Sequence, residues 1–362
     1  MLALAMCCAF AVLGEFALRV AGFRYASAGE RDVIWSRERD AELFGRGLYR
    51  RDEREIWKPV PGAELPWAPG EHLDESGFRG EPVPLARTPG VLRIAILGAD
   101  EALGVGMPRE KTWPRLLQRA IAARGRSAEI LCAAVEGSTL RQGIERWRVE
   151  VLPYHPDLLL VTFAGEHESR AAPRGCSDAK RIADNGGLGF PDARLRVSYL
   201  PAVLQSARVF ECARWFGEVL SGEYWDWRGG ELQEQRLRPV ENDFASPGVR
   251  RVSIGEFNAL VRTLRDELAA EHCRLMLFPI PGEAAVQGHS GVVRDYQTLL
   301  VNAAAREKIP KLSALERFEA AIAGGAQATE FFSSGQLSER GHAFLAGELG
   351  RDLVPRLAEL KF

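Results

Sequence analysis

The sequence lacks the patterns that would assign it to several common classes of protein. Its six cysteines are scattered without a CxxC pair or the spacing of a zinc site. The formal net charge of −2 leaves no basic excess of the kind that nucleic-acid binding needs. No internal repeat is visible. Composition is that of a packed globular protein, with 46% hydrophobic and 27% charged residues.

Long uncharged apolar runs are also missing, except at the start of the chain. The stretch "MLALAMCCAFAVLG" is continuously apolar but shorter than the roughly 20 residues that span a bilayer. It is typical of a signal-peptide core or a short signal anchor. We expect residues 1–25 to be an uncleaved membrane anchor and the remainder to be extracytoplasmic. However, Arg19, Arg24 and Arg31 follow the apolar run, and the positive-inside tendency would keep them cytoplasmic. The sequence therefore leaves the orientation open.

The rest of the chain divides into a linker and one large domain. Residues 26–90 are charged and then rich in proline and glycine, which predicts a juxtamembrane segment followed by an extended linker. Residues 91–362 alternate short apolar runs with amphipathic stretches. We predict buried strands near residues 92–98, 128–135, 157–165, 274–280 and 309–312, and helices near residues 113–121, 140–151, 257–268, 292–306 and 345–353. This alternation predicts an α/β fold, a three-layer α/β/α sandwich of flavodoxin-like type around a central parallel sheet.

One long insertion breaks the alternation at about residues 168–252. Insertions of this length often cover or shape a binding site, although a surface elaboration is an equally good interpretation. In an open parallel sheet, ligands bind beyond the carboxyl ends of the strands. The first three predicted strands end at residues 98–101, 135–139 and 165–168, and we expect these segments to converge.

Four segments resemble, in order, the conserved blocks of the SGNH/GDSL hydrolase family. They are "LGADEALGVGMPREKTWPRLLQ", "CAAVEGSTLRQGIERW", "PDLLLVTFAGEHE" and "FFSSGQLSERGHAFLAGEL". The lead-in "DESGFRGEPVP" is similar to the segment that precedes the first block in membrane-anchored relatives. The resemblance implies the flavodoxin-like α/β/α fold and an ancestral serine esterase or acyltransferase acting on acyl esters, including acetylated carbohydrates or lipids.

The family's catalytic residues are nearly all replaced. The resemblance places Asp100 at the nucleophilic serine, after Ala99 at the preceding aspartate. Where the family has an oxyanion-hole asparagine, a histidine base and its orienting aspartate, this chain has Glu166, Gln336 and Ser333. Only Gly137, whose backbone N–H belongs to the oxyanion hole by resemblance, keeps its family identity.

These replacements remove the chemistry of acyl transfer. Glutamine at 336 cannot take a proton at neutral pH, so the nucleophile has no base there. Asp100 and Glu166 place negative charge where the tetrahedral intermediate needs hydrogen-bond donors. We therefore expect a catalytically inactive SGNH/GDSL-hydrolase-like protein, a pseudoenzyme without a cofactor. It would attach to the membrane and bind an acylated, carbohydrate or protein ligand through Asp100, Glu101, Gly137, Glu166 and His167.

Two catalytic alternatives remain open at the same positions. Asp100, Glu101, Glu166 and His167 offer oxygen and nitrogen ligands suited to a divalent metal. Alternatively, Asp100 could be a carboxylate nucleophile with His167 as a nearby base. Either would make the chain an active hydrolase with a remodelled site, and Glu101 could equally face solvent.

Three further residues are given structural roles. His342 matches the Gly-His of the family's last helix, outside the proton-transfer position, and we expect it to pack or to bind a helix end. Ser138 and Thr139 follow Gly137 at a predicted helix start, where a hydroxyl group can cap free N–H groups.

Overall fold

The computed structural model describes residue 13 and residues 47–52, 54–170, 177–179, 182 and 250–358. The predicted anchor, apart from Leu13, and most of the predicted insertion lie outside these residues. Within them, no helix combines the length and the apolar character needed to cross a membrane.

A four-stranded parallel sheet forms the centre of the domain. Its strands are β3 (Leu92–Leu97), β4 (Ala128–Cys132), β5 (Leu158–Val161) and β6 (Arg274–Leu277), in the order β4-β3-β5-β6. Every residue of β3 is buried, as expected of a parallel strand covered on both faces. The predicted fifth strand contributes a single parallel bridge, between Leu277 and Lys311.

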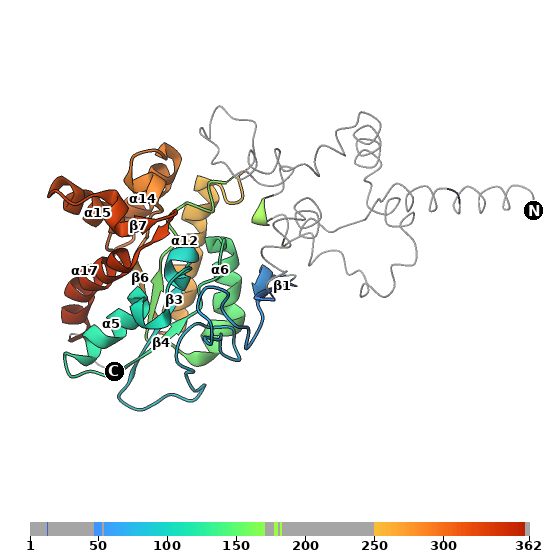
Figure 1. Cartoon of the computed structure of the whole chain (residues 1–362). Helices are drawn as coiled ribbons and strands as arrows, with labels where there is room; N and C mark the ends of the chain where they lie inside the picture. The colour runs from blue at the N-terminus through green and yellow to red at the C-terminus, as the bar shows by residue number, and fades with distance from the viewer. Residues whose placement is uncertain are drawn as a thin grey trace, which may run out of the picture.

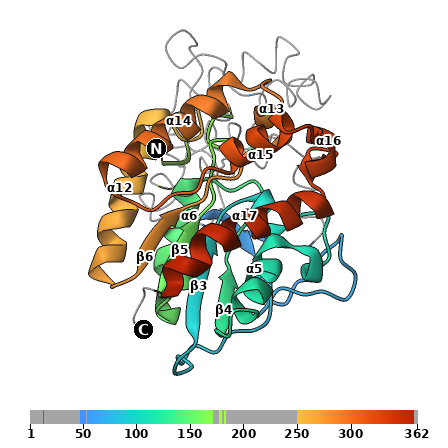
Figure 2. The same cartoon turned by 90° about the vertical axis from the view of Figure 1, so that its left-hand side faces the viewer.

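Helices cover both faces of this sheet, which confirms the predicted three-layer α/β/α architecture (Figures 1 and 2). One face carries α5 (Trp113–Ala122) and α17 (Glu339–Ala358), and the other carries α6 (Leu140–Arg146), α12 (Ile254–Ala270) and α14 (Gly291–Arg306). Alternate residues of β3 point to opposite layers because side chains alternate along a strand. Thus Ile94 packs with Trp113, whereas Ala95 packs with Trp147.

An N-terminal hairpin packs onto the domain within the segment predicted to be a linker. Its antiparallel strands are β1 (Tyr49–Asp52) and β2 (Ile56–Pro59). Apolar side chains of this hairpin join Leu65, Leu73 and Val135 in a small third core. Alternation over only four residues in each strand is too short a pattern to predict such a hairpin.

Short elements complete the edge of the sheet where the strands end. They are α4 (Asp100–Leu103), the 3₁₀ turn Arg109–Lys111, α13 (Glu283–Val286), α15 (Ala314–Ala323) and α16 (Ala328–Phe331). A hairpin of two-residue strands follows, β7 (Phe332–Ser333) and β8 (Gln336–Leu337). Ser334 and Gly335 in its turn have φ of 52° and 80°, the two positive values that a type I′ turn requires.

Candidate functional site

The strand order places the topological switch point, where α/β folds have their ligand-binding crevice, at the carboxyl end of β3. In the order β4-β3-β5-β6, the chain leaves β3 toward β4 on one side and leaves β5 toward β6 on the other side, so the two connections diverge there. The loops after these two strands touch at Gly98. A Cβ atom at Gly98 would lie 1.9 Å from Thr162 Oγ1, so only glycine fits.

The three predicted strand ends meet in this crevice, as the sequence led us to expect. Asp100, the first residue of α4, accepts a hydrogen bond through Oδ1 from the backbone N–H of Gly137 at 2.6 Å. His167 Nε2 lies 3.6 Å from the same Asp100 oxygen. The His167 side chain is buried, with 4% exposed, and 15% of the Asp100 side chain is exposed. The first, second and third blocks are therefore joined through one carboxylate.

Glu166 reaches the same region from the loop after β5. Its Oε2 atom is buried and has no hydrogen-bond partner among the described residues. Gly282, at the start of α13, stands beside it: a Cβ atom there would lie 3.0 Å from Glu166 Oε2. Nothing in the sequence relates Gly282 to the third block, so this contact emerges only from the fold.

Burial and mutual repulsion raise the pKa values of two acidic groups of the crevice, Glu101 and Glu166. Burial, followed by the charge of Asp100, raises the pKa of Glu101 to about 8. Glu101 is thus half-buried and largely protonated at neutral pH, rather than turned fully to solvent. Burial also raises the pKa of Glu166; Arg170 opposes this shift and Asp100 adds to it. The crevice consequently carries less negative charge than its three carboxyl groups would suggest.

The candidate metal ligands do not form a metal centre here. Among the residues that the structure describes, no group of three or more His, Cys, Asp or Glu side chains is arranged to hold a metal ion. Asp100, Glu166 and His167 all belong to that part of the chain.

A buried ion pair that the sequence did not reveal holds the turn at Gly137. Arg251 Nη1 donates to the Gly137 carbonyl at 2.7 Å, and Arg251 Nη2 lies 2.9 Å from Asp178 Oδ2. Arg251 Nη2 also donates to Gln142 Oε1 at 2.7 Å. Asp178 and Arg251 are 73 residues apart and lie toward opposite ends of the predicted insertion, so no local pattern connects them.

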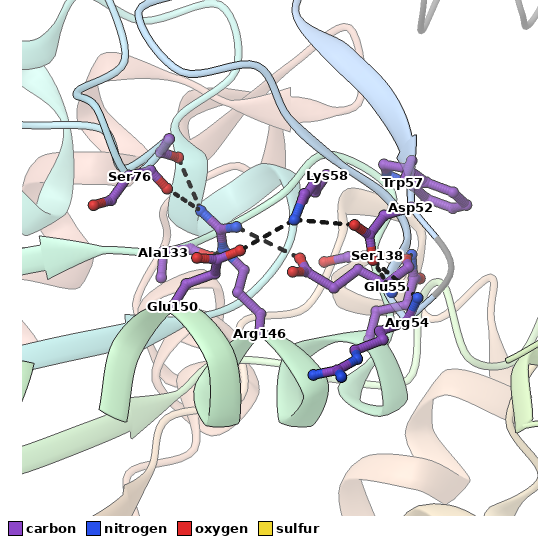
Figure 3. A network of polar contacts seen from close by, with 12 residues as sticks. Asp52, Arg54, Glu55, Trp57, Lys58, Ser76, Ala133, Ser138, Arg146 and Glu150 are labelled. Carbon is purple, nitrogen blue, oxygen red and sulfur yellow. Dashed lines mark hydrogen bonds and ion pairs between the residues drawn. The ribbon is translucent and has the colours of Figure 1, made fainter. Parts of the chain in front are cut away.

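The N-terminal hairpin binds the neighbouring peptide groups of the same turn. Glu136 N donates to Tyr49 Oη at 3.2 Å, and Trp57 Nε1 donates to the Glu136 carbonyl at 3.2 Å. At the start of the same turn, Arg146 on α6 donates to the Ala133 carbonyl at 2.8 Å (Figure 3). The turn that carries Gly137 is therefore fixed from both ends by protein groups.

Glu55 anchors the hairpin to α6. Glu55 Oε2 lies 3.5 Å from Arg146 Nη1, and Figure 3 shows this contact beside the Lys58–Asp52 ion pair. Burial raises the pKa of Glu55 to about 7, and the charge of Arg146 opposes that shift.

Thr139 begins α6, as predicted, but its neighbour does not cap that helix. The Thr139 backbone N–H donates to Gln142 Oε1 at 3.1 Å, one half of a capping box. Ser138 Oγ instead donates to the Gly98 carbonyl at 3.1 Å, which ties the second block to the first. Glu168 Oε1 accepts from Leu140 N at 2.8 Å, and burial raises the pKa of Glu168 to about 7.

The positions of the last block lie on the β7–β8 hairpin. Gln336 is half-buried on β8, which lies beside α4, whereas Ser333 is exposed on β7. The hairpin contacts α13 through a hydrogen bond of 3.2 Å from Gly335 N to Glu283 Oε2. Gln336 therefore comes close to the crevice without supplying a base.

His342 is a structural residue, as expected. It is fully buried on α17, and its Nδ1 accepts from the backbone N–H of Trp113 at 3.2 Å, at the start of α5. Burial, aided by the charge of Arg79, lowers the pKa of His342 to about 4, so the ring is neutral. The preceding Gly341 is required by packing, because a Cβ atom would lie 2.2 Å from the Phe331 carbonyl oxygen.

Comparison with known proteins finds a partial similarity to an esterase. No family model matches the chain. An arylesterase of Vibrio mimicus is 28% identical over 81 residues, which are 22% of this chain and 40% of that protein. The match thus spans less than half of the relative's length.

Solved structures with similar topology include three hydrolases. The lipase/acylhydrolase from Enterococcus faecalis has a TM-score of 0.44 at 14% identity, covering 73% of this chain and 96% of its own. An acetyl xylan esterase has a TM-score of 0.44 at 12% identity, covering 72% and 100%. A GDSL-like lipase from Bacteroides thetaiotaomicron has a TM-score of 0.36 at 11% identity, covering 73% and 88%.

Three observations agree on the relationship. The four sequence blocks occur in family order, their loops gather at one switch point of a parallel sheet, and one stretch matches an arylesterase. The chain therefore combines an α/β/α fold with sequence blocks that resemble those of SGNH/GDSL hydrolases.

Proposed function

We propose that this protein is a pseudoenzyme of the SGNH/GDSL family, which binds a ligand in the crevice without hydrolysing it. The observation that carries the proposal is the 2.6 Å hydrogen bond from Gly137 N to Asp100 Oδ1. By family resemblance, this N–H stabilises the oxyanion of the tetrahedral intermediate. Here the carboxylate at the nucleophile position already accepts it.

An internal anion in the oxyanion hole opposes acyl transfer in two ways. The intermediate would have to displace Asp100 from a charge-assisted hydrogen bond, roughly twice as strong as a neutral one. Its own negative charge would then develop beside Asp100. The loss of one oxyanion donor costs about 2.7–4 kcal/mol, or about 10²–10³ in kcat. Gln336 supplies no base to offset this loss.

Hydrolysis of p-nitrophenyl acetate tests the proposal. We expect the purified protein and its Asp100→Asn variant to release p-nitrophenol at the rate of buffer alone. Asp100→Ser should stay inactive as well, because a restored hydroxyl would still lack a base. The exposed Glu316→Gln variant on α15 is the matched control. Turnover by the wild type that is lost in Asp100→Asn but kept in Glu316→Gln would overturn the proposal.

A ligand with hydroxyl donors suits the unpaired acceptor in the crevice. Buried Glu166 Oε2 lacks a donor, and half-buried Glu101 can donate while it is protonated. We propose that an acylated or underivatised carbohydrate, or a protein segment with similar groups, binds here. Saturation-transfer NMR with an acetylated xylo-oligosaccharide and its deacetylated form provides the test. Signals that persist unchanged in Glu166→Ala would exclude the crevice as the binding site.

An active hydrolase with a remodelled site is the second candidate. The 3.6 Å separation between His167 Nε2 and Asp100 Oδ1 favours it, because a histidine near an acyl-aspartate could activate water. This candidate predicts a covalent acyl-Asp100 adduct after rapid quenching with an activated ester. Peptide mass spectrometry should then show accumulation of the adduct in His167→Gln. The absence of an adduct in both proteins would reject this candidate.

We propose membrane attachment through residues 1–25, which rests on their apolar sequence alone. Fractionation of cells expressing the full chain should place it in the membrane pellet. A chain starting at residue 26 should move to the supernatant. Equal distributions of the two proteins would refute the anchor.

A further inference from the structure

A second cavity lies on the α5 side of the sheet, apart from the crevice. It has a volume of about 100 Å³ and is bounded by residues 79–84, the N-terminal half of α5 and strand β4. Figure 2 shows α5 beside β4, which is an edge strand of the sheet. None of Asp100, Gly137, Glu166 and His167 lines this cavity. The family resemblance assigns no role to it.

The walls of the cavity are mostly apolar, with one buried arginine. Ala102, Leu103 and Ile130 contribute aliphatic surface. Arg79 also lines the cavity and is only 5% exposed. A small apolar space next to a buried cation suits a ligand with an aliphatic part and an anionic end.

Arg79 has one donor to spare. Its Nη1 donates to the carbonyls of Leu103 and Gly104 at 2.6 and 2.8 Å, and its Nη2 lies 3.0 Å from Glu71 Oε2. Its buried Nε atom has no hydrogen-bond partner among the described residues. A buried N–H group without an acceptor is unfavourable, so an acceptor placed in the cavity would gain stability there.

The residues that line the cavity carry a formal excess of one positive charge. Three arginines, Arg79, Arg109 and Arg115, line it together with two glutamates. Every one of these charged groups already has an ion-pair partner; Arg79 is paired with Glu71 and Arg115 with Glu110. Glu81 lies 2.9 Å from Arg109, and Glu129 lies 2.7 Å from Arg93, which is outside the cavity wall. Guanidinium groups bind carboxylates better than ammonium groups do, because their planar donors match the two oxygens.

We propose that this cavity binds a short aliphatic carboxylate, such as acetate or propionate. The carboxylate accepts from Arg79, and the alkyl end packs against Leu103 and Ile130. The size fits this class of ligand. A cavity of about 150 Å³ holds benzene, so about 100 Å³ accommodates four or five non-hydrogen atoms. This inference is independent of whether the crevice is catalytic.

Binding to the full chain tests the proposal, with sodium propionate and neutral propionamide as probes. Titration is followed by saturation-transfer NMR at constant ionic strength. We expect propionate to bind with a Kd on the order of 1 mM, and propionamide at least about tenfold more weakly. Cyclohexanecarboxylate, which exceeds the cavity, should bind at least about tenfold more weakly than propionate as well.

Variants on one helix locate the site. Gln118→Phe on α5 would fill the cavity from its wall and should weaken propionate binding at least about tenfold. Ala122→Phe, at an exposed position near the end of α5, is the matched control and should bind as the wild type does.

Three results would overturn the proposal. They are equal affinity for propionate and propionamide, unchanged binding in Gln118→Phe, and no saturable binding by the wild type up to about 50 mM. If Gln118→Phe does not fold, the relative affinity of the wild type for propionate and propionamide is sufficient to accept or reject the proposal. Hydrolysis of p-nitrophenyl acetate does not enter any of these outcomes.

Discussion

Replacing Glu101 by glutamine should remove part of the pH dependence of stability. In the unfolded chain this carboxyl group has its ordinary pKa of 4.5, whereas burial and the charge of Asp100 raise the value in the folded protein to about 8. Between these two values the folded protein holds a proton that the unfolded chain has released. The free energy of unfolding therefore falls as the pH rises through this window, and the loss is complete above about pH 8.

The magnitude follows from the difference in bound protons. While the folded state holds one more proton than the unfolded chain, each unit of rise in pH lowers the free energy of unfolding by about 1.4 kcal/mol. Between about pH 5 and pH 7 the full effect would be ~2–3 kcal/mol. Glu101 is only half-buried, so solvent screening reduces the expected loss to roughly 1–2 kcal/mol. That is a measurable share of the 5–15 kcal/mol by which a typical domain is stable.

Urea unfolding at pH 5 and pH 7, followed by circular dichroism, measures this difference. Glu101→Gln keeps the shape of the side chain but cannot ionise, so its stability should fall less between the two pH values than that of the wild type. Glu55 and Glu168, whose pKa values near 7 act in the same direction, are present in both proteins and cancel. Glu316→Gln, on the exposed side of α15, should behave as the wild type does. An identical pH dependence in Glu101→Gln and wild type would refute the reasoning.

Three further predictions concern buried residues of the domain. Arg251→Met should lower the free energy of unfolding by about 3–5 kcal/mol, because it leaves the Asp178 carboxylate buried without its cation. Adding Asp178→Leu should restore part of this stability, as measured by urea unfolding. If the double variant is no more stable than Arg251→Met, the ion-pair explanation is wrong. Gly98→Ala should cost at least about 1–3 kcal/mol by overpacking against Thr162 Oγ1, and Gly98→Ala with Thr162→Ala should be more stable than the single variant. His342→Gln should make the free energy of unfolding depend less on pH between pH 6.5 and pH 4. In the wild type the pKa of His342 is about 4, so the free energy of unfolding falls by up to ~1.4 kcal/mol per pH unit as the pH falls through this range. Thermal unfolding that shows the same pH dependence in both proteins would count against this prediction.

The architecture was predictable from the sequence because its signals are local. The apolar run of β3 and the helical stripe that contains Leu117 each reveal one element by periodicity, and their alternation dictates a parallel sheet. The meeting of Asp100, Gly137 and His167 followed from the same rule, since parallel strands end at one edge. In each case the relevant pattern lies within a few residues.

The supports of the site depend on distant pairs that leave no such pattern. Arg251 and Asp178 are separated by most of the predicted insertion, and Tyr49 reaches Glu136 from a hairpin with strands of only four residues. The pKa of Glu101 depends on its burial, which no local sequence pattern indicates. Local sequence patterns therefore predict which residues meet, whereas the groups that hold them in place and set their protonation are visible only in the three-dimensional structure.

The hydrogen bond between Gly137 and Asp100 also bears on what one substitution could change. Because the backbone amide already has an acceptor within the protein, the loop holds this contact with no ligand present. Asp100→Ser would remove that acceptor, and Gln336 would still offer no base. A single change at position 100 would therefore break an internal contact without supplying the chemistry of acyl transfer.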